Sequence, residues 1–225
     1  MNLVRAFRIG SLVFVGGVFA GNFLPRSCVE QDVEESSFLD KEVAELNENF
    51  SYGVSGEDLV YLTRILYFEG AFDESATDIE EIQLGYIAIA SVVKNRWEFD
   101  TMYESTKFAG DKGLRGVVEK EGQFSCVKDN YPYFMKKSFY DSKGELSLSH
   151  GQMDSDRTEL AYDTLVTVLA EEADDPTRGA VFYKTKSVPQ WWGGREAFYL
   201  NRKKCELNFT TRVNSHEFFT VVCEK

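Results

Sequence analysis

Two segments repeat apolar residues with the period of an α-helix, and this pattern limits the fold more than any other feature of the chain. The first runs from Glu57 to Glu69 and the second from Ile79 to Trp97. Apolar side chains that recur every three or four residues line one face of a helix, which must be buried against another element. These positions are Leu59, Leu62, Ile65, Leu66, Ile82, Tyr86, Ile89, Val93 and Trp97. Ser55 and Asp58 resemble a capping segment at the start of the first helix.

The rest of the chain continues with helices and closes with short strands. We expect a short helix at Leu114–Glu121 and a longer one that begins at Asp156 or Thr158. Two β-like pieces follow, Gly179–Tyr183 and Phe218–Cys223, which are rich in small, β-branched and aromatic residues. Helices first and strands last are typical of an α+β fold, here mainly helical with a small sheet.

The N-terminal residues have the pattern of a targeting element. Arg5 and Arg8 precede an apolar run, Ile9–Leu24. The run is short for a membrane span, which needs about 20 residues, but it suits a signal sequence. Val18-Phe19-Ala20 is an acceptable cleavage site. Several glycines weaken the hydrophobicity of the run, so an uncleaved tether to the inner membrane and a buried N-terminal helix are the alternatives.

This pattern predicts three parts and an exported protein. Residues 1–28 would be the signal sequence or anchor, 29–55 an acidic linker that includes a helical stretch, and 56–225 the folded domain. The domain would then lie in the periplasm, the cell envelope or the extracellular space. Export also suits Cys205 and Cys223, which could pair in an oxidising compartment.

Composition excludes several classes of function. The net charge of −12 argues against a non-specific nucleic-acid binder, which needs a basic face. The four cysteines form no C-x-x-C pair and there are only two histidines, so we expect no metal site and no cofactor. We expect a monomer.

Glu69 is the residue whose setting points to chemistry. It ends an apolar helix directly after Leu66-Tyr67-Phe68. A carboxyl group held against aromatic surface is penalised when charged, and a carboxyl kept protonated can donate its proton to a glycosidic oxygen. The alternative is an exposed glutamate at a helix end.

A series of sequence blocks around Glu69 resembles the SleB-type cell-wall hydrolase family, the spore-cortex-lytic enzymes and their bacterial and phage relatives. The blocks are Thr63–Gly70 with Gly85–Arg96, Gly116–Ser125 ending in Gln-Phe-Ser, Asp175–Tyr183, Pro189–Trp191 and Ser215–Phe218. The resemblance implies a fold related to lysozymes and lytic transglycosylases. It also implies peptidoglycan as the substrate, cleaved between N-acetylmuramic acid and N-acetylglucosamine, with Glu69 as the catalytic acid.

The chemistry after proton transfer stays open. The resemblance favours a lytic transglycosylase, which needs one glutamate. Asp73 stands four positions after Glu69, where the family has a second acidic residue, and Glu74 follows it. A muramidase that uses one of these carboxylates is therefore an alternative, as is a catalytically silent peptidoglycan-binding protein of the same fold. The lack of a zinc or Cys/His constellation argues against an amidase or endopeptidase.

Further residues are candidates for binding the glycan. Gln123 and Ser125 could donate hydrogen bonds to it or merely cap a loop. Tyr183 and Trp191 could form platforms for sugar rings, with core packing as the competing role. His216 is a further candidate for contacting the substrate, although we interpret it as a structural residue near the cleft rather than a general base. The segment 128–156 has no counterpart in the family pattern, and a substrate-contacting flap is one interpretation of it.

Overall fold

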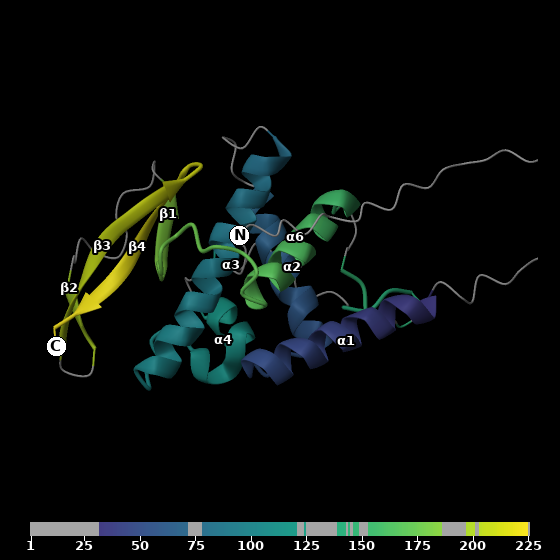
Figure 1. Cartoon of the computed structure of the whole chain (residues 1–225), viewed down its shortest axis with the longest axis horizontal. Helices are drawn as coiled ribbons and strands as arrows, with labels where there is room; N and C mark the ends of the chain where they lie inside the picture. The colour runs from purple at the N-terminus through teal and green to yellow at the C-terminus, as the bar shows by residue number, and fades with distance from the viewer. Residues whose placement is uncertain are drawn as a thin grey trace, which may run out of the picture.

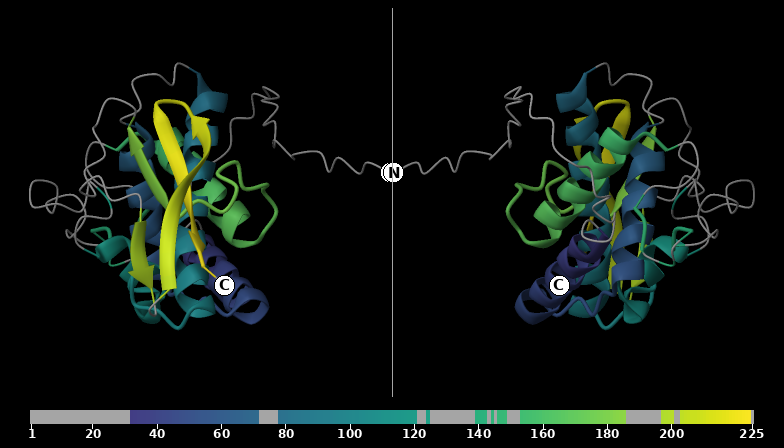
Figure 2. Two further views of the ribbon diagram at one scale, coloured as in Figure 1. Left: turned by 90° about the vertical axis from the view of Figure 1, so that its left-hand side faces the viewer. Right: turned by 90° about the vertical axis from the view of Figure 1, so that its right-hand side faces the viewer.

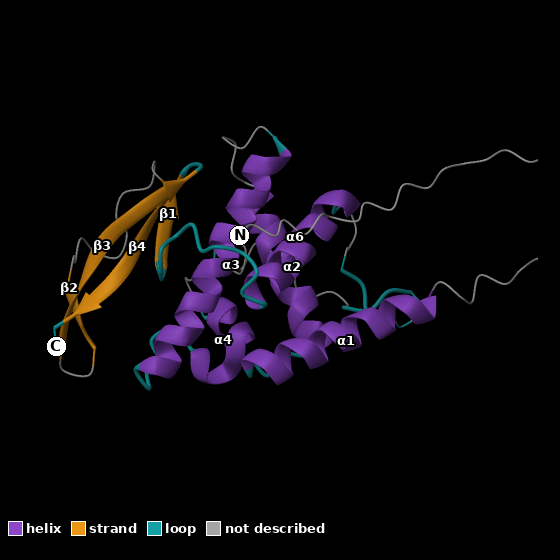
Figure 3. Cartoon of the chain, in the orientation of Figure 1, coloured by secondary structure: helices purple, strands orange, loops and turns teal. Residues whose placement is uncertain are grey.

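The structure is a computed structural model in which helices and strands lie in separate layers. It describes residues 32–71, 78–120, 124, 139–142, 144, 146–148, 153–185, 197–200 and 203–224. Within these ranges the helices form one body and a small antiparallel sheet stands at its side (Figures 1 and 3). The expected α+β class, mainly helical with a small sheet, is confirmed.

The described elements follow the order that the sequence predicts, helices before strands. They are α1 (Asp32–Phe50), α2 (Gly56–Ala71), α3 (Ile79–Met102), the 3₁₀ helix η1 (Gly110–Lys112), α4 (Gly113–Glu119), α6 (Ser155–Leu169), β1 (Phe182–Thr185), β2 (Ala197–Leu200), β3 (Lys203–Val213) and β4 (His216–Cys223). The strand order in the sheet is β1-β4-β3-β2, and every neighbouring pair is antiparallel.

Side-chain caps define where the main helices begin. Ser55 and Asp58 cap α2 reciprocally: the Asp58 amide donates to Ser55 Oγ at 3.2 Å, and the Ser55 amide donates to Asp58 Oδ2 at 2.9 Å. This arrangement confirms the predicted capping segment. Asp78 and Asp154 accept from the backbone at the starts of α3 and α6 in the same way. Each cap satisfies an amide that the helix cannot bond itself.

Helix α3 joins the two layers. One side of it packs with α2 and α6 in the largest hydrophobic cluster, where Ile82, Ile89 and Val93 are buried. Its Ala88 and Val92 belong to a second cluster that includes sheet residues. The end-on views in Figure 2 show the sheet standing against the helical body. Small residues on this side of α3 let the sheet approach closely.

Helix α1 lies within the segment that we expected to be a linker. Its Leu39 and Leu46 are buried in the same cluster as α2 and α6. Asn47 adds two hydrogen bonds to Val54, both of 2.8 Å, which tie the end of α1 to the start of α2. The hydrophobic core therefore extends into the acidic segment. The division into 1–28, 29–55 and 56–225 stays a prediction.

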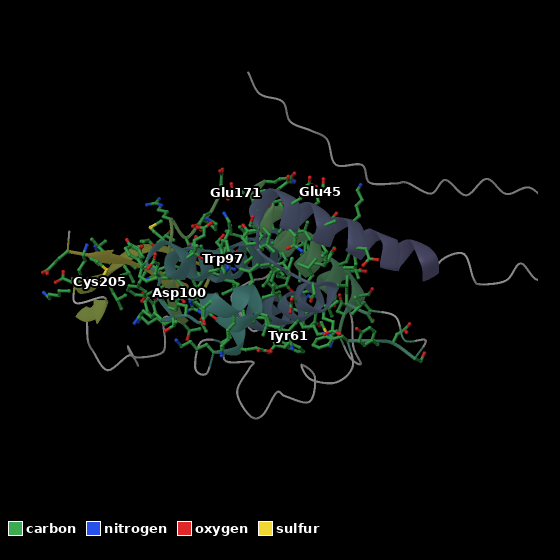
Figure 4. The ribbon with its side chains drawn as sticks, turned by 90° about the horizontal axis from the view of Figure 1, so that it is seen from below. Glu45, Tyr61, Trp97, Asp100, Glu171 and Cys205 are labelled. Atoms are coloured by element: carbon green, nitrogen blue, oxygen red, sulfur yellow. A yellow bond between two sulfur atoms is a disulfide. The ribbon has the colours of Figure 1, made fainter. Side chains whose placement is uncertain are left out.

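The hairpin of β3 and β4 is closed by a disulfide between Cys205 and Cys223, the pair that the sequence suggested. The two residues face each other in the strand register. Figure 4 shows Cys205 at the sheet end of the molecule, away from Glu45 and Glu171 on the helical body. The disulfide thus fixes the end of the sheet that lies opposite the Asn214–Ser215 turn.

Some expectations concern residues that lie outside the described ranges. The predicted leader, including Ile9–Leu24, is among them, and so is most of the 128–156 insertion. Within the described part, no helix combines the length and hydropathy needed to cross a bilayer. The described piece of the insertion is held on α2, because buried Arg64 donates to the carbonyl oxygens of Ser147 at 2.9 Å and Leu148 at 3.3 Å.

Candidate active site

Glu69 lies in the last turn of α2, and its side chain is 7% exposed. The next residue, Gly70, lets the helix end lie directly on α3. A Cβ atom on Gly70 would be 2.3 Å from Cε1 of Tyr86, a ring that is fully buried. Only glycine fits this contact, so the position of Glu69 depends on the absence of a side chain next to it.

Tyr183 of β1 holds the carboxyl group of Glu69. Its hydroxyl donates a hydrogen bond of 2.9 Å to Glu69 Oε2, across 114 residues of sequence. The bond joins the end of a helix to the first strand of the sheet, so the candidate site lies at the junction of the two layers. A hydroxyl that donates to a carboxyl oxygen restricts the orientation of that carboxyl group.

Aromatic rings surround Tyr183. The centroid of its ring lies 6.0 Å from that of Phe124, 5.5 Å from that of His216 and 6.0 Å from that of Phe218. Phe124 and Phe218 are each 1% exposed, whereas Tyr183 and His216 are half-buried. Tyr183 therefore has a fixed ring plane and a hydroxyl directed at Glu69.

Arg96 of α3 places a cation beneath this tyrosine. Its guanidinium carbon lies 5.9 Å from the Tyr183 ring centroid and 5.0 Å from that of Phe124. Its Nε donates to the carbonyl oxygen of Val181 at 2.7 Å. Burial lowers the pKa of Arg96 to about 10, and the neighbouring Tyr183 and Glu69 act in the opposite direction. Arg96 is thus charged at neutral pH.

The turn that leads into β1 is held by polar contacts of Asp175 and Asn95. Asp175 accepts from the amide and hydroxyl of Thr177 at 2.7 and 2.6 Å, and from the amide of Gly179 at 2.7 Å. Asn95 donates to Asp175 at 3.1 Å and to the Ala180 carbonyl at 3.0 Å. Burial alone would raise the pKa of Asp175, but the hydrogen bonds from its neighbours outweigh it and lower that pKa. These contacts fix the path of the chain towards Tyr183.

The structure brings three of the predicted site residues together. Glu69 and Tyr183 are bonded, and His216 lies against Tyr183. The other predicted residues, Asp73, Gln123, Ser125 and Trp191, lie outside the described ranges, as does Glu74. Phe124, between the two predicted binding residues Gln123 and Ser125, is buried.

Sequence reasoning did not single out Asn95, Arg96 or Asp175 as parts of the site. A signal was present for the first two, since polar and charged residues continue the helix directly after the apolar pair Val92-Val93. Buried polar groups need partners, so such residues suggest a tertiary contact. The sequence alone could not indicate that the partner is the segment before β1.

A cavity of about 270 Å³ lies elsewhere, between α1 and α6. It is lined by Glu42, Glu45, Leu46, Asn49, Phe50, Val166, Thr167, Ala170 and Glu172, and so excludes Glu69 and Tyr183. It is not the candidate active site. Within the described ranges, no group of three or more acidic, histidine or cysteine side chains is arranged to hold a metal ion.

A buried carboxyl group held by a tyrosine is an arrangement suited to acid–base chemistry. The chain belongs to the Cell Wall Hydrolase family, whose sequence profile matches residues 80–219. At the level of this family, it is a peptidoglycan-cleaving enzyme that acts outside the cytoplasm. The matched residues include Arg96, Tyr183 and His216 but begin after Glu69.

Two solved structures are similar to the chain at low identity. One is the catalytic domain of the germination-specific lytic transglycosylase SleB from Bacillus anthracis, with 19% identity and a TM-score of 0.43, covering 75% of this chain and 98% of that chain. The other is the catalytic domain of SleB from Bacillus cereus, with 17% identity and a TM-score of 0.42, covering 75% and 93%. No curated protein sequence gives a significant match.

Proposed function

We propose that this protein cleaves the bond between N-acetylmuramic acid and N-acetylglucosamine in peptidoglycan, as a lytic transglycosylase with Glu69 as its one catalytic carboxyl group. The observation that carries the proposal is the buried Glu69 carboxyl, held by the Tyr183 hydroxyl at 2.9 Å within a family of cell-wall hydrolases. A site of this kind restricts both the direction and the solvation of the acid.

The proposed reaction uses Glu69 twice. The protonated carboxyl gives its proton to the glycosidic oxygen while the bond from that oxygen to C1 of the muramoyl residue breaks. The carboxylate then accepts the proton of the muramoyl C6 hydroxyl. At the same time the oxygen of that hydroxyl bonds to C1 and closes a 1,6-anhydro ring. Water is not consumed, and Glu69 ends protonated as it began. Tyr183 keeps the carboxyl oriented through both steps.

A second function is hydrolysis by the same acid. Asp73 or Glu74 would then serve as nucleophile or base, and water would replace the C6 hydroxyl. A catalytically silent peptidoglycan-binding protein would retain the fold and bind sacculi without cutting them. The hydrogen bond that Tyr183 donates to Glu69 favours an enzyme over a silent binding protein.

Mass spectrometry of digested sacculi separates these functions. We expect anhydro-muropeptides. Reducing muramic acid ends would indicate hydrolysis instead, freed stem peptides would indicate an amidase, and undigested sacculi would indicate a silent binder. Each of these three outcomes contradicts the proposal.

Glu69→Gln tests the assigned acid. The neutral isostere has no proton to donate, so we expect digestion to fall at least a thousandfold while the thermal unfolding midpoint stays close to that of the wild type. Glu57→Gln is the matched control, because Glu57 lies in the first turn of the same helix and its carboxyl also accepts from a tyrosine hydroxyl, that of Tyr140. We expect Glu57→Gln and Glu74→Gln to keep most activity. Substantial turnover by Glu69→Gln would refute the assignment.

The remaining expectations complete the proposal. Gln123, Ser125, Trp191 and Asp73 contact the glycan, and His216 supports Tyr183. The protein is exported by its N-terminal leader and acts as a monomer, either released or tethered to the inner membrane by residues 9–24. Alanine variants of the four binding residues should raise the substrate concentration needed for half-maximal digestion.

A further inference from the structure

Arg96 is a buried cation beside the proposed acid, and the proton transfer described above does not use it. It is 3% exposed, and its pKa of about 10 leaves it charged at neutral pH. Taking a guanidinium out of water is unfavourable unless nearby groups compensate. Within the described residues, its Nη1 has no hydrogen-bond partner. Among the described residues, its partners are the Val181 carbonyl and the rings of Phe108, Phe124 and Tyr183, whose centroids lie 5.5, 5.0 and 5.9 Å from the guanidinium carbon.

The surroundings of Arg96 connect it to the reaction. The guanidinium lies under the Tyr183 ring, and the Tyr183 hydroxyl donates to Glu69. Glu69 and Tyr183 are also the two groups that favour the charged form of Arg96. Tyr183 is thus in contact with both the buried cation and the carboxyl group of Glu69.

We propose that Arg96 is a positioning residue for the reaction of Glu69. Its buried guanidinium fixes the strand that carries Tyr183 and supplies the positive charge that stabilises the Glu69 carboxylate after the proton has left. This inference rests on the proposed function of Glu69. In the proposed cycle the carboxylate forms between the two proton transfers, so the charge acts on this intermediate stage of the reaction rather than on substrate binding.

Other titratable groups lie at the same junction. Tyr86 of α3 lies under Gly70, and burial raises its pKa to about 12, so it stays neutral during an assay between pH 5 and about 9. Lys184 of β1 and Glu217 of β4 are paired, with their Nζ and Oε2 atoms 3.1 Å apart. His216 of β4 lies against Tyr183, and a histidine can titrate in the assay range.

The test is the pH profile of sacculus digestion by full-length variants. Arg96→Gln keeps a donor for the Val181 carbonyl but removes the charge, and Arg96→Met removes both. The alkaline limb of the profile follows the loss of the acid's proton. Removing a nearby positive charge should move that limb to higher pH by about one unit. We expect this shift in both neutral variants, a lower rate at the plateau, and little shift in Arg96→Lys.

Arg64→Met is the matched control. Arg64 is also a buried arginine that donates to backbone carbonyls and lies over an aromatic ring, that of Phe139. It precedes Glu69 by five residues on α2, which places it about 140° around the helix. Replacing Arg64 should lower the stability of the protein and leave the alkaline limb of the pH profile unchanged. The Arg96→Gln profile is also measured in a His216→Gln background, where we expect the same shift.

The outcomes separate this inference from the proposed function. If Glu69→Gln is inactive and the limbs of the folded neutral variants coincide with that of the wild type, Arg96 serves only as an anchor and the inference is wrong. A shift in Arg96→Lys as large as in Arg96→Gln would also overturn it, because geometry and not charge would then be responsible. If Glu69→Gln remains active, the proposed function itself fails.

Discussion

Removing the Tyr183 hydroxyl should slow the reaction without unfolding the protein. Tyr183→Phe keeps the ring contacts with Phe124, His216 and Phe218 and deletes the hydrogen bond to Glu69. A hydrogen bond to a charged acceptor contributes about 1.5–3 kcal/mol. The bond is strongest when Glu69 is a carboxylate, so the loss should fall on the rate at saturating substrate, by about 10-fold to 150-fold.

The assay is the initial release of soluble muropeptides from purified sacculi across a range of substrate concentrations. Tyr140→Phe is the control, since the Tyr140 hydroxyl donates to Glu57 at 2.6 Å on the exposed surface. It should leave the rate near that of the wild type. A Tyr183→Phe enzyme with an unchanged maximal rate would refute the reasoning, because the contact with Glu69 would then contribute nothing to catalysis.

Three further predictions concern stability. Gly70→Ala should lower the free energy of unfolding by about 1–3 kcal/mol, since the new methyl group overlaps the Tyr86 ring. Helix propensity alone would favour alanine by about 1 kcal/mol. A urea titration that shows a more stable variant would therefore contradict the clash. The pKa of Asp175 is lower in the folded protein than in the unfolded chain. Its carboxylate therefore stabilises the fold fully above about pH 5, and this stabilisation is lost as the pH falls through the lowered pKa. Asp175→Asn should therefore lose about 1–2 kcal/mol at pH 7 and show a smaller drop in unfolding midpoint between pH 7 and pH 3 than the wild type; equal drops would argue against it. Reduction of the Cys205–Cys223 disulfide should lower the free energy of unfolding by about 3 kcal/mol, measured by urea titration with and without reductant, and no change would show that the hairpin is stable without it.

Helices that carry a clear apolar period could be predicted from the sequence. Both α2 and α3 begin within one residue of the expected positions, and the caps at Ser55 and Asp78 explain why. Helix α3 continues to Met102, beyond the expected end at Trp97, because Phe99 and Asp100 are also buried. Local pattern was sufficient wherever a helix has one buried face and a polar start.

The sheet was only partly predictable. The expected pieces at Gly179–Tyr183 and Phe218–Cys223 overlap β1 and β4, but β2 and β3 were not expected. The alternation of β3 is weak, since it carries many polar residues and its register with β4 shifts between Phe209 and Thr211. Its extended form depends on pairing with both neighbours, which is a tertiary effect.

The acidic N-terminal segment shows the same limit. Its charges suggested a solvated spacer, yet Leu39 and Leu46 are enough to bury one side of α1. The candidate site was likewise only partly predictable. The sequence pointed to Glu69 through its local setting and a family resemblance, whereas the bond to Tyr183 and the place of Arg96 depend on how the sheet docks on α3.

The contact between Glu69 and Tyr183 spans the junction between the helical layer and the sheet. Separation of the two layers would break it even if every helix and strand stayed intact. Enzyme activity should then be lost at lower temperature or denaturant concentration than the far-ultraviolet circular dichroism signal. Digestion of sacculi would in that case report on the attachment of the sheet, which a spectrum of secondary structure does not detect.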